Sequence, residues 1–115
     1  MRTEKDALGE RELPDDVLYG IQTLRAVENF PISGGRPHPE LIRASALVKE
    51  AAAEASMALG QLDHRVGRAI VQAAREVASG LWHEHFVVDP FQAGAGTSHN
   101  MNTNEVVANR AIELL

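Results

Sequence analysis

The stretch QAGAGTSHNMNTN, residues 92–104, joins a glycine-rich loop to a segment with helical character, EVVANRAIELL. Gly94 and Gly96 let the backbone approach a ligand closely, and Thr97 and Ser98 follow them as hydroxyl donors. The first turn of a helix has unpaired N–H groups and the positive end of the helix dipole, so it attracts anions. This order of loop, hydroxyls and helix start indicates a site that can hold a carboxylate.

A flexible turn followed by an ordinary N-cap explains the same residues about equally well, because glycine-rich loops often precede helices. Asparagine forms helices poorly, so its abundance just beyond the loop requires a packing or ligand explanation. Four asparagines fall within ten residues of the chain: Asn100, Asn102, Asn104 and Asn109. Their density favours the ligand-holding interpretation over the plain cap.

The chain has 115 residues, enough for one small domain with a thin core. Its 11 basic and 16 acidic residues are interspersed and give a net charge of −5, so nucleic acid is not an expected partner. No apolar run of about 18 residues is present, so no membrane association is expected. The charged N-terminus, MRTEKDALGERELP, lacks the apolar core of a signal peptide. Without cysteines, disulfides and thiolate metal sites are excluded, and a cytoplasmic protein is the default expectation.

Hydrophobic periodicity predicts a mainly α chain with four helices, at about residues 16–29, 39–59, 63–79 and 98–115. Pro39 suits the first position of the second helix, and Gly60 suits the position just after its end. The third helix has the clearest apolar stripe: Val66, Ala69, Ile70, Ala73, Ala74 and Val77. The second and third helices are expected to form an αα-hairpin, because their connection is short.

Strand character occurs in two places outside these helices. Phe86-Val87-Val88 is rich in β-forming residues and is stopped by Pro90. The polar N-terminal arm has a second possible strand around residues 2–5. The sequence therefore predicts a short β-hairpin-like pairing between the arm and residues at about 84–88.

Other candidate functional residues are weaker. His83 and His85 would share one face of a strand, but no further ligands have useful spacing, so we expect surface histidines and no metal site. His99 is either an acid–base group or a solvent-facing residue, and we expect the latter. Arg25 and Arg110 can each bind a substrate carboxylate or pair with a glutamate on their own helix. No Ser/His/Asp triad, dinucleotide fingerprint or P-loop is evident, and no cofactor is expected.

Three segments resemble the N-terminal domain of the aspartase/fumarase superfamily: YGIQTLRAVENFPISG (19–34), VKEAAAEAS (48–56) and VDPFQAGAGTSHNMNTNEVVANRAIEL (88–114). The N-terminal arm with Pro14 also resembles the start of that family, so the resemblance covers essentially the whole chain. The aspartate ammonia-lyase branch is more similar than the fumarases. Fumarases typically have serine at the position of Ala95 and glutamine at the position of Ser98.

The resemblance implies a mostly helical, much longer enzyme that assembles as a homotetramer, with active sites formed by three subunits. It implies reversible elimination of ammonia from L-aspartate to give fumarate. A base removes the C3 proton to give an enediolate-like carboxylate, and ammonia then leaves, so donors must be placed in advance at the growing negative charge. The alternatives are a fumarate hydratase of the same superfamily and a non-catalytic helical assembly module.

The resemblance also implies substrate-binding residues. Thr97 matches a family threonine that contacts substrate, Ser98 and Asn100 neighbour it in the same loop, and Asn104 lies in the same segment. Arg25 matches a family arginine. The segment that holds the family's serine base does not occur here, so no catalytic residue is expected within residues 1–115. This range is therefore expected to be one truncated N-terminal domain, without its central helical bundle and C-terminal domain, and inactive alone.

Overall fold

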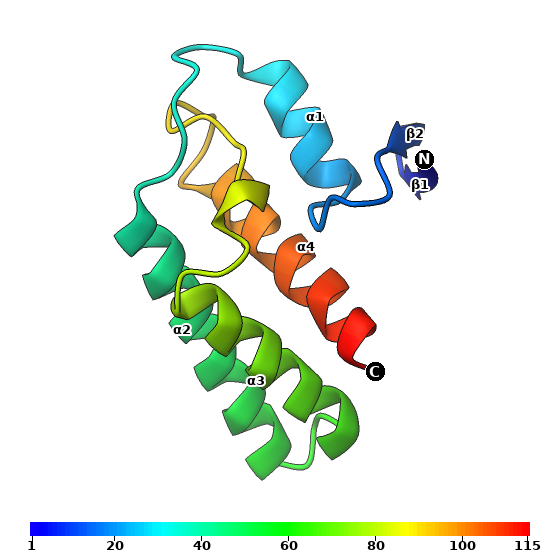
Figure 1. The fold of residues 1–115 in the computed structure, drawn as a ribbon, viewed down its shortest axis with the longest axis vertical. Helices are drawn as coiled ribbons and strands as arrows, with labels where there is room; N and C mark the ends of the chain where they lie inside the picture. The colour runs from blue at the N-terminus through cyan, green and yellow to red at the C-terminus, as the bar shows by residue number, and fades with distance from the viewer.

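The computed structural model describes all of residues 1–115. Its elements in chain order are β1 (Arg2–Asp6), β2 (Gly9–Leu13), α1 (Ile21–Asn29), α2 (Pro39–Ala58), α3 (His64–Ala78), a single 3₁₀ turn (His83–His85) and α4 (Thr97–Leu114) (Figure 1). The mainly α class with four helices is confirmed. The boundaries of α2, α3 and α4 agree with the prediction within one residue.

The first helix is shorter than predicted, because it begins at Ile21 rather than at about residue 16. Two backbone carbonyl groups ahead of the helix accept hydrogen bonds from the side chain of Arg2. The guanidinium of Arg2 donates to the carbonyl oxygen of Val17 at 2.8 Å and to that of Tyr19 at 2.6 Å. A carbonyl that accepts from Arg2 in this way lies outside the helical ladder, and the helix starts only after Gly20.

The predicted strand pairing is wrong in its partner. β1 pairs antiparallel with β2, so that Arg2 lies opposite Leu13 and Asp6 lies opposite Gly9. Residues 84–88 form no strand. The two paired strands are neighbours along the chain, and a two-residue connection closes a hairpin at less entropic cost than a long loop would.

The segment after the 3₁₀ turn is held by α4 instead of by a strand. The N–H of Val87 donates to Oδ1 of Asn102 at 3.0 Å, and Nδ2 of Asn102 donates to the carbonyl oxygen of His85 at 3.0 Å. Asn102 is completely buried. Its amide thus supplies one donor and one acceptor, as a neighbouring strand would.

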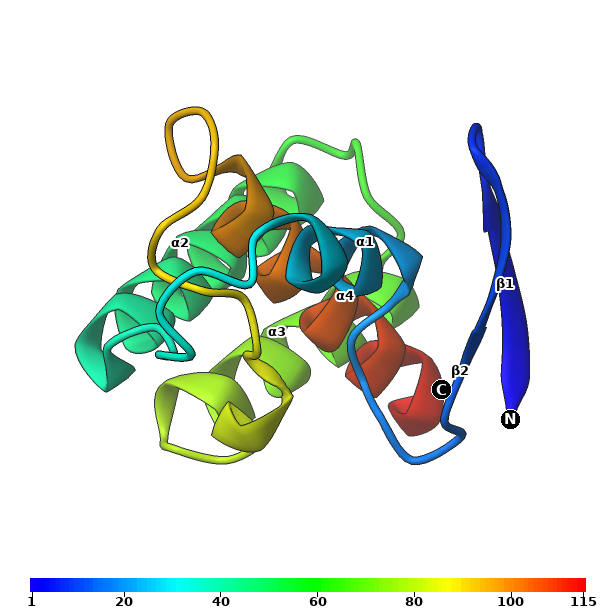
Figure 2. The same ribbon diagram turned by 90° about the horizontal axis from the view of Figure 1, so that it is seen from above.

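The helices form two layers about α4. Figures 1 and 2 show α4 between the antiparallel pair α2–α3 and the shorter α1, with the hairpin at the outer side of α1. The core lies where α2, α3 and α4 meet and includes one large aromatic side chain, Phe86. Its other members are Leu18, Ile42, Ala46, Ala69, Ala73, Ala74, Val77, Val106, Val107 and Ala111.

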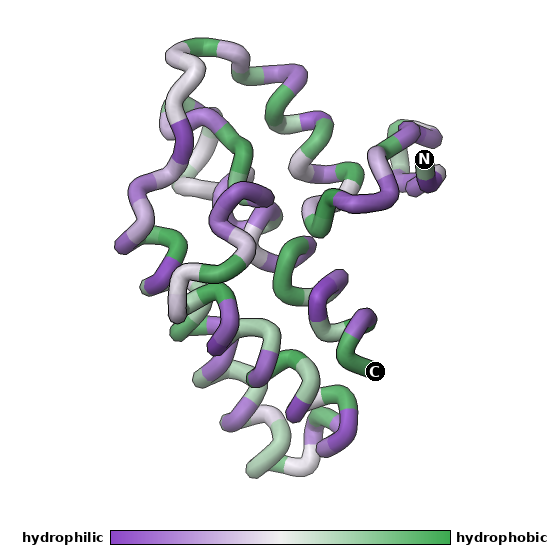
Figure 3. Tube along the Cα trace, viewed as in Figure 1, coloured by the Kyte–Doolittle hydropathy of each residue, from purple (hydrophilic) through white to green (hydrophobic).

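Each helix contains both apolar and polar residues along its length (Figure 3). No helix combines the length and the apolar character that a membrane crossing needs. The second half of α4 and the residue that follows it are mixed in the same way. Val106 and Val107 are buried, whereas Ile112 and Leu115 are exposed.

Candidate functional site

The start of α4 offers unpaired donors. The N-cap is Gly96, which has no side chain to accept a hydrogen bond. The N–H of His99 donates to Oε1 of Gln92 at 2.8 Å, but the N–H groups of Thr97 and Ser98 have no acceptor within the chain. Two donors at the positive end of the helix are therefore free to receive an anion.

The loop before α4 requires glycine at two positions. Gly94 and Gly96 have φ of +76° and +82°, in the left-handed region that strains residues with a Cβ. The backbone of Gly94 lies so near the helix that a Cβ there would stand 3.2 Å from Oγ1 of Thr97. The loop thus folds back against the helix start, and the Thr97 side chain remains exposed.

Thr97 and Ser98 line an open cleft of about 240 Å³ between the hairpin turn, α1 and the first turn of α4. Arg25 lines the same cleft from α1. The remaining lining residues are Asp6, Ala7, Leu8, Gln22, Ala26, Asn29, Phe30 and Met101. The structure therefore brings together Thr97, Ser98 and Arg25 of the five residues that the sequence indicated as substrate-binding.

The charge of Arg25 is already compensated by Asp6. Nε of Arg25 donates to Oδ2 of Asp6 at 2.8 Å, Nη2 donates to Oδ1 at 2.9 Å, and Nη2 also donates to the carbonyl oxygen of Gly9 at 3.2 Å. The hydrogen bond from Arg25 lowers the pKa of Asp6, and the same bond raises the pKa of Arg25. Its ion-pair partner is thus in the hairpin rather than on its own helix, and Arg25 fastens β1 to α1.

Asn100 and Asn104 lie outside this cleft. Oδ1 of Asn100 accepts from Nζ of Lys49 on α2 at 2.7 Å. Asn104 and Lys49 line a separate recess of about 180 Å³ beside Val107. The two asparagines are one helical turn apart and both lie beside Lys49 of α2, whereas Thr97 lines the cleft beside α1.

The abundance of asparagine in α4 has a packing explanation. Asn102 holds the backbone of residues 85–87, as described above. Asn109 donates from Nδ2 to the carbonyl oxygen of Leu18 at 2.6 Å, which ties α4 to the segment before α1. Asparagine side chains therefore connect α4 to irregular segments that have no helical or strand partner of their own.

His99 is buried rather than solvent-facing, contrary to the sequence-based expectation. Its side chain is 7% exposed, and its Nε2 lies 2.8 Å from Oγ of Ser45. Its Nδ1 is buried without a hydrogen-bond partner, and burial lowers the pKa of the ring. The reason is tertiary, because the first turn of α4 packs against α2 on this face.

His83 and His85 have structural roles. Nε2 of His83 lies 2.9 Å from the carbonyl oxygen of Val77, and Nδ1 of His85 accepts from the N–H of Leu18 at 3.1 Å. Neither belongs to a cluster of three or more His, Cys, Asp or Glu side chains that could hold a metal ion.

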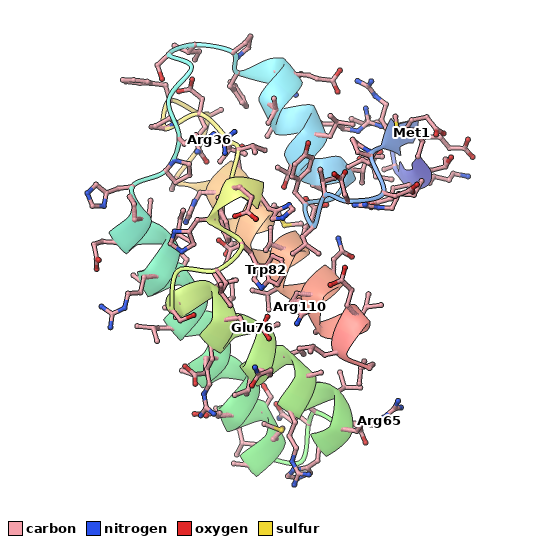
Figure 4. The ribbon with its side chains drawn as sticks, in the orientation of Figure 1. Met1, Arg36, Arg65, Glu76, Trp82 and Arg110 are labelled. Atoms are coloured by element: carbon pink, nitrogen blue, oxygen red, sulfur yellow. The ribbon has the colours of Figure 1, made fainter.

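Arg110 also has a structural role. Its Nε donates to Oε1 of Glu76 at 2.7 Å, its Nη1 donates to Glu113 at 3.0 Å, and its guanidinium stacks 5.0 Å from the centre of the Trp82 ring. Figure 4 shows Glu76, Trp82 and Arg110 grouped where α3 and α4 meet. The predicted pairing with a glutamate on its own helix is confirmed by the contact with Glu113.

Two residues beside the cleft were missed from the sequence: Asp6, which lines it, and Glu105, whose carboxylate reaches the start of α1. A usable signal for Glu105 was the absence of a capping side chain at Gly20, directly ahead of a helix. An acceptor from another element was therefore needed there. No comparable local signal marked Asp6.

Comparison with known proteins connects this geometry to one family. Residues 9–115 match the model of the lyase family. The chain is 60% identical over 115 residues to an aspartate ammonia-lyase from a Bacillus species, covering 100% of this chain and 25% of that protein. It is 54% identical over 114 residues to a class II fumarate hydratase from Halobacterium salinarum, covering 99% of this chain and 24% of that protein.

A solved structure has the same fold. The crystal structure of a fumarate lyase:delta crystallin from Brucella melitensis superposes with a TM-score of 0.97 at 55% identity, covering 99% of this chain and 26% of that one. The chain spans about a quarter of the length of these relatives.

Proposed function

This chain belongs to the lyase family, and we propose that it is the N-terminal portion of an aspartate ammonia-lyase, which converts L-aspartate reversibly to fumarate and ammonia. The observation that carries the proposal is the first turn of α4. There the Thr97 side chain and two free N–H groups lie at an open cleft. Identity of 60% with the Bacillus ammonia-lyase supports this particular reaction.

The elimination requires stabilisation of a growing negative charge. A base takes the C3 proton of L-aspartate, charge accumulates on the adjacent carboxylate, and the C–N bond then breaks with loss of ammonia. The N–H groups of Thr97 and Ser98 and the Thr97 hydroxyl act as fixed donors toward that carboxylate. Arg25 forms part of the cleft wall and shapes the cleft, because two of its guanidinium nitrogens already donate to the carboxylate of Asp6.

The cleft has no residue suited to remove the C3 proton. Asp6 is the one carboxylate that lines it, and the Arg25 hydrogen bond lowers its pKa, which makes it a weaker base. We therefore assign the general base to a part of the protein outside residues 1–115. We also propose a cytoplasmic homotetramer; the exposed apolar side chains of Ile112 and Leu115 support association.

Fumarate hydratase is the second candidate, favoured by 54% identity with the Halobacterium enzyme. In that reaction water replaces ammonia, and the same donors serve the same carboxylate. Ala95 and Ser98 differ from the serine and glutamine that fumarases typically have, which places ammonia elimination first.

The test uses the full-length protein, with L-aspartate and L-malate assayed separately by the absorbance of fumarate. Fumarate from L-aspartate is the expected result, and residues 1–115 alone are expected to give none. Turnover of L-malate without turnover of L-aspartate would assign the hydratase reaction instead. Turnover by residues 1–115 at the rate of the full-length protein would contradict a base outside them.

A further inference from the structure

We propose that Glu105 is a positioning residue for this site: its carboxylate caps α1 and thereby sets the width of the cleft between α1 and Thr97. This inference rests on the proposed function and adds a residue that touches no substrate. Glu105 and Thr97 belong to the same helix, and α1 forms the facing wall.

The cap consists of three hydrogen bonds. Oε1 of Glu105 accepts from the N–H of Thr23 at 2.8 Å and from its hydroxyl at 2.5 Å, and Oε2 accepts from the N–H of Gln22 at 3.0 Å. The N-cap of α1 is Gly20, which offers no side-chain acceptor. Glu105 therefore satisfies N–H groups that the helix itself leaves unpaired, and its negative charge lies at the positive end of the helix.

Gly20 shows how closely the two helices approach. A Cβ on Gly20 would stand 2.3 Å from Oε2 of Glu105 and 2.9 Å from Oε1 of Glu4. Glu4 accepts from the N–H of Ile21 at 3.0 Å but also pairs with Arg2. Glu105 has no basic partner, so the two N–H groups and the Thr23 hydroxyl of α1 are its hydrogen-bond donors, and the contact joins the two helices.

The contact of Glu105 with Gln22 and Thr23, called the joint below, is well placed to control the width of the cleft. Thr23 is fully buried, which strengthens a hydrogen bond to a carboxylate and makes its loss costly. Gln22 lies at the joint and also lines the cleft, and Arg25 follows it one helical turn later. Removal of the carboxylate leaves buried donors without an acceptor, so we expect α1 to move away from α4.

A wider cleft weakens the hold on substrate and transition state alike, because α1 forms a wall and takes no part in bond breaking. The loss of such uniform binding raises KM and leaves kcat unchanged. A purely structural role gives the opposite pattern, because less folded enzyme lowers the apparent kcat while KM stays constant.

The experiment compares full-length wild-type protein with Glu105→Gln, Gly20→Ala, Thr23→Val and the control Glu113→Gln. Glutamine keeps the shape of Glu105 but turns one acceptor into a donor that faces the Gln22 N–H. Glu113 lies on the same helix, and its side chain is 55% exposed. Thr23→Val removes only the hydroxyl and is the mildest of the three test changes. Each protein is measured for KM and kcat with L-aspartate, for the Kd of unreactive succinate by calorimetry, and for Tm.

We expect KM and the succinate Kd to rise about tenfold in Glu105→Gln and Gly20→Ala, with kcat within about twofold of wild type. Thr23→Val is expected to give a smaller rise in the same direction, and Glu113→Gln no change. A lower Tm with unchanged KM and Kd in the test variants would overturn the positioning role. Wild-type protein that binds succinate, weakened by Glu105→Gln, but forms no fumarate would reject the proposed function and keep the inference. Wild-type protein that binds no succinate and forms no fumarate would overturn both.

Discussion

Asp6 and Arg25 form a two-point ion pair, with Nε to Oδ2 at 2.8 Å and Nη2 to Oδ1 at 2.9 Å. Both side chains are largely buried, at 13% and 16% exposure. The pair attaches the N-terminal hairpin to α1 and keeps the hairpin turn as one wall of the cleft that Thr97 lines.

Mutations of Asp6 and Arg25 should have non-additive effects on stability. Asp6→Ala and Arg25→Ala should each lower Tm at neutral pH, and the double variant should lower it by less than the sum, because the second change removes a partner already lost. Arg11→Ala is the control, since its pair with Glu28 is about 40% exposed and should matter little. Additive effects in thermal unfolding would contradict the coupling.

The same pair predicts a dependence on acid. The Arg25 hydrogen bond lowers the pKa of Asp6 below its ordinary value of 3.8. The stabilisation is therefore present above pH 3.8 and is lost as the pH falls through the lower folded-state pKa. Unfolding in denaturant across this range should show a loss of stability that Asp6→Ala reduces.

Thr97→Ala in the full-length enzyme should weaken transition-state binding by about 2–4 kcal/mol, as expected for the loss of one donor to a developing oxyanion. The change should appear in kcat/KM with L-aspartate. Thr3→Ala, at an exposed hairpin threonine, is the matched control. An unchanged kcat/KM would remove Thr97 from the site.

Gly67 lies inside α3, where a Cβ would stand 2.3 Å from Sδ and 2.5 Å from Cγ of Met57 on α2. Alanine favours the helix by about 1 kcal/mol, but overpacking costs about 1–3 kcal/mol, so Gly67→Ala should destabilise by up to about 2 kcal/mol. In a Met57→Ala background the clash is absent, and the same change should stabilise. Denaturant unfolding measures both, and an equal effect in the two backgrounds would contradict this packing.

The buried side chain of His99 should give the stability of the fold a second dependence on pH. Burial lowers its pKa below the ordinary 6.5, so at lower pH the unfolded chain binds a proton that the folded chain does not. Stability should therefore fall as the pH decreases below 6.5 and level off below the folded-state pKa. His99→Gln should flatten this slope, whereas His64→Gln, at an exposed position, should retain it. A slope that survives His99→Gln would assign it to another group.

The candidate site was only partly predictable from the sequence. Thr97 and Ser98 were found because a glycine loop and a helix start are local features. Asn100 and Asn104 were grouped with them by proximity along the chain, yet in the fold both lie beside Lys49 of α2 and outside the cleft. Arg25 reaches the cleft as expected, but its partner Asp6 lies on another element, which no local pattern revealed.

The sequence by itself determined the four helices, the start of α2 at Pro39 and the left-handed turn at Gly60, because these depend on residues within a few positions of each other. Only the tertiary structure decided where α1 begins, why residues 84–88 form no strand, and why His99 is buried. Those outcomes depend on hydrogen bonds between distant segments, such as Asn102 with residues 85–87 and Glu105 with Gln22 and Thr23. A polar side chain can hydrogen-bond to a group that is distant in the sequence as well as to a neighbouring one. Hydrophobic periodicity therefore does not predict these contacts.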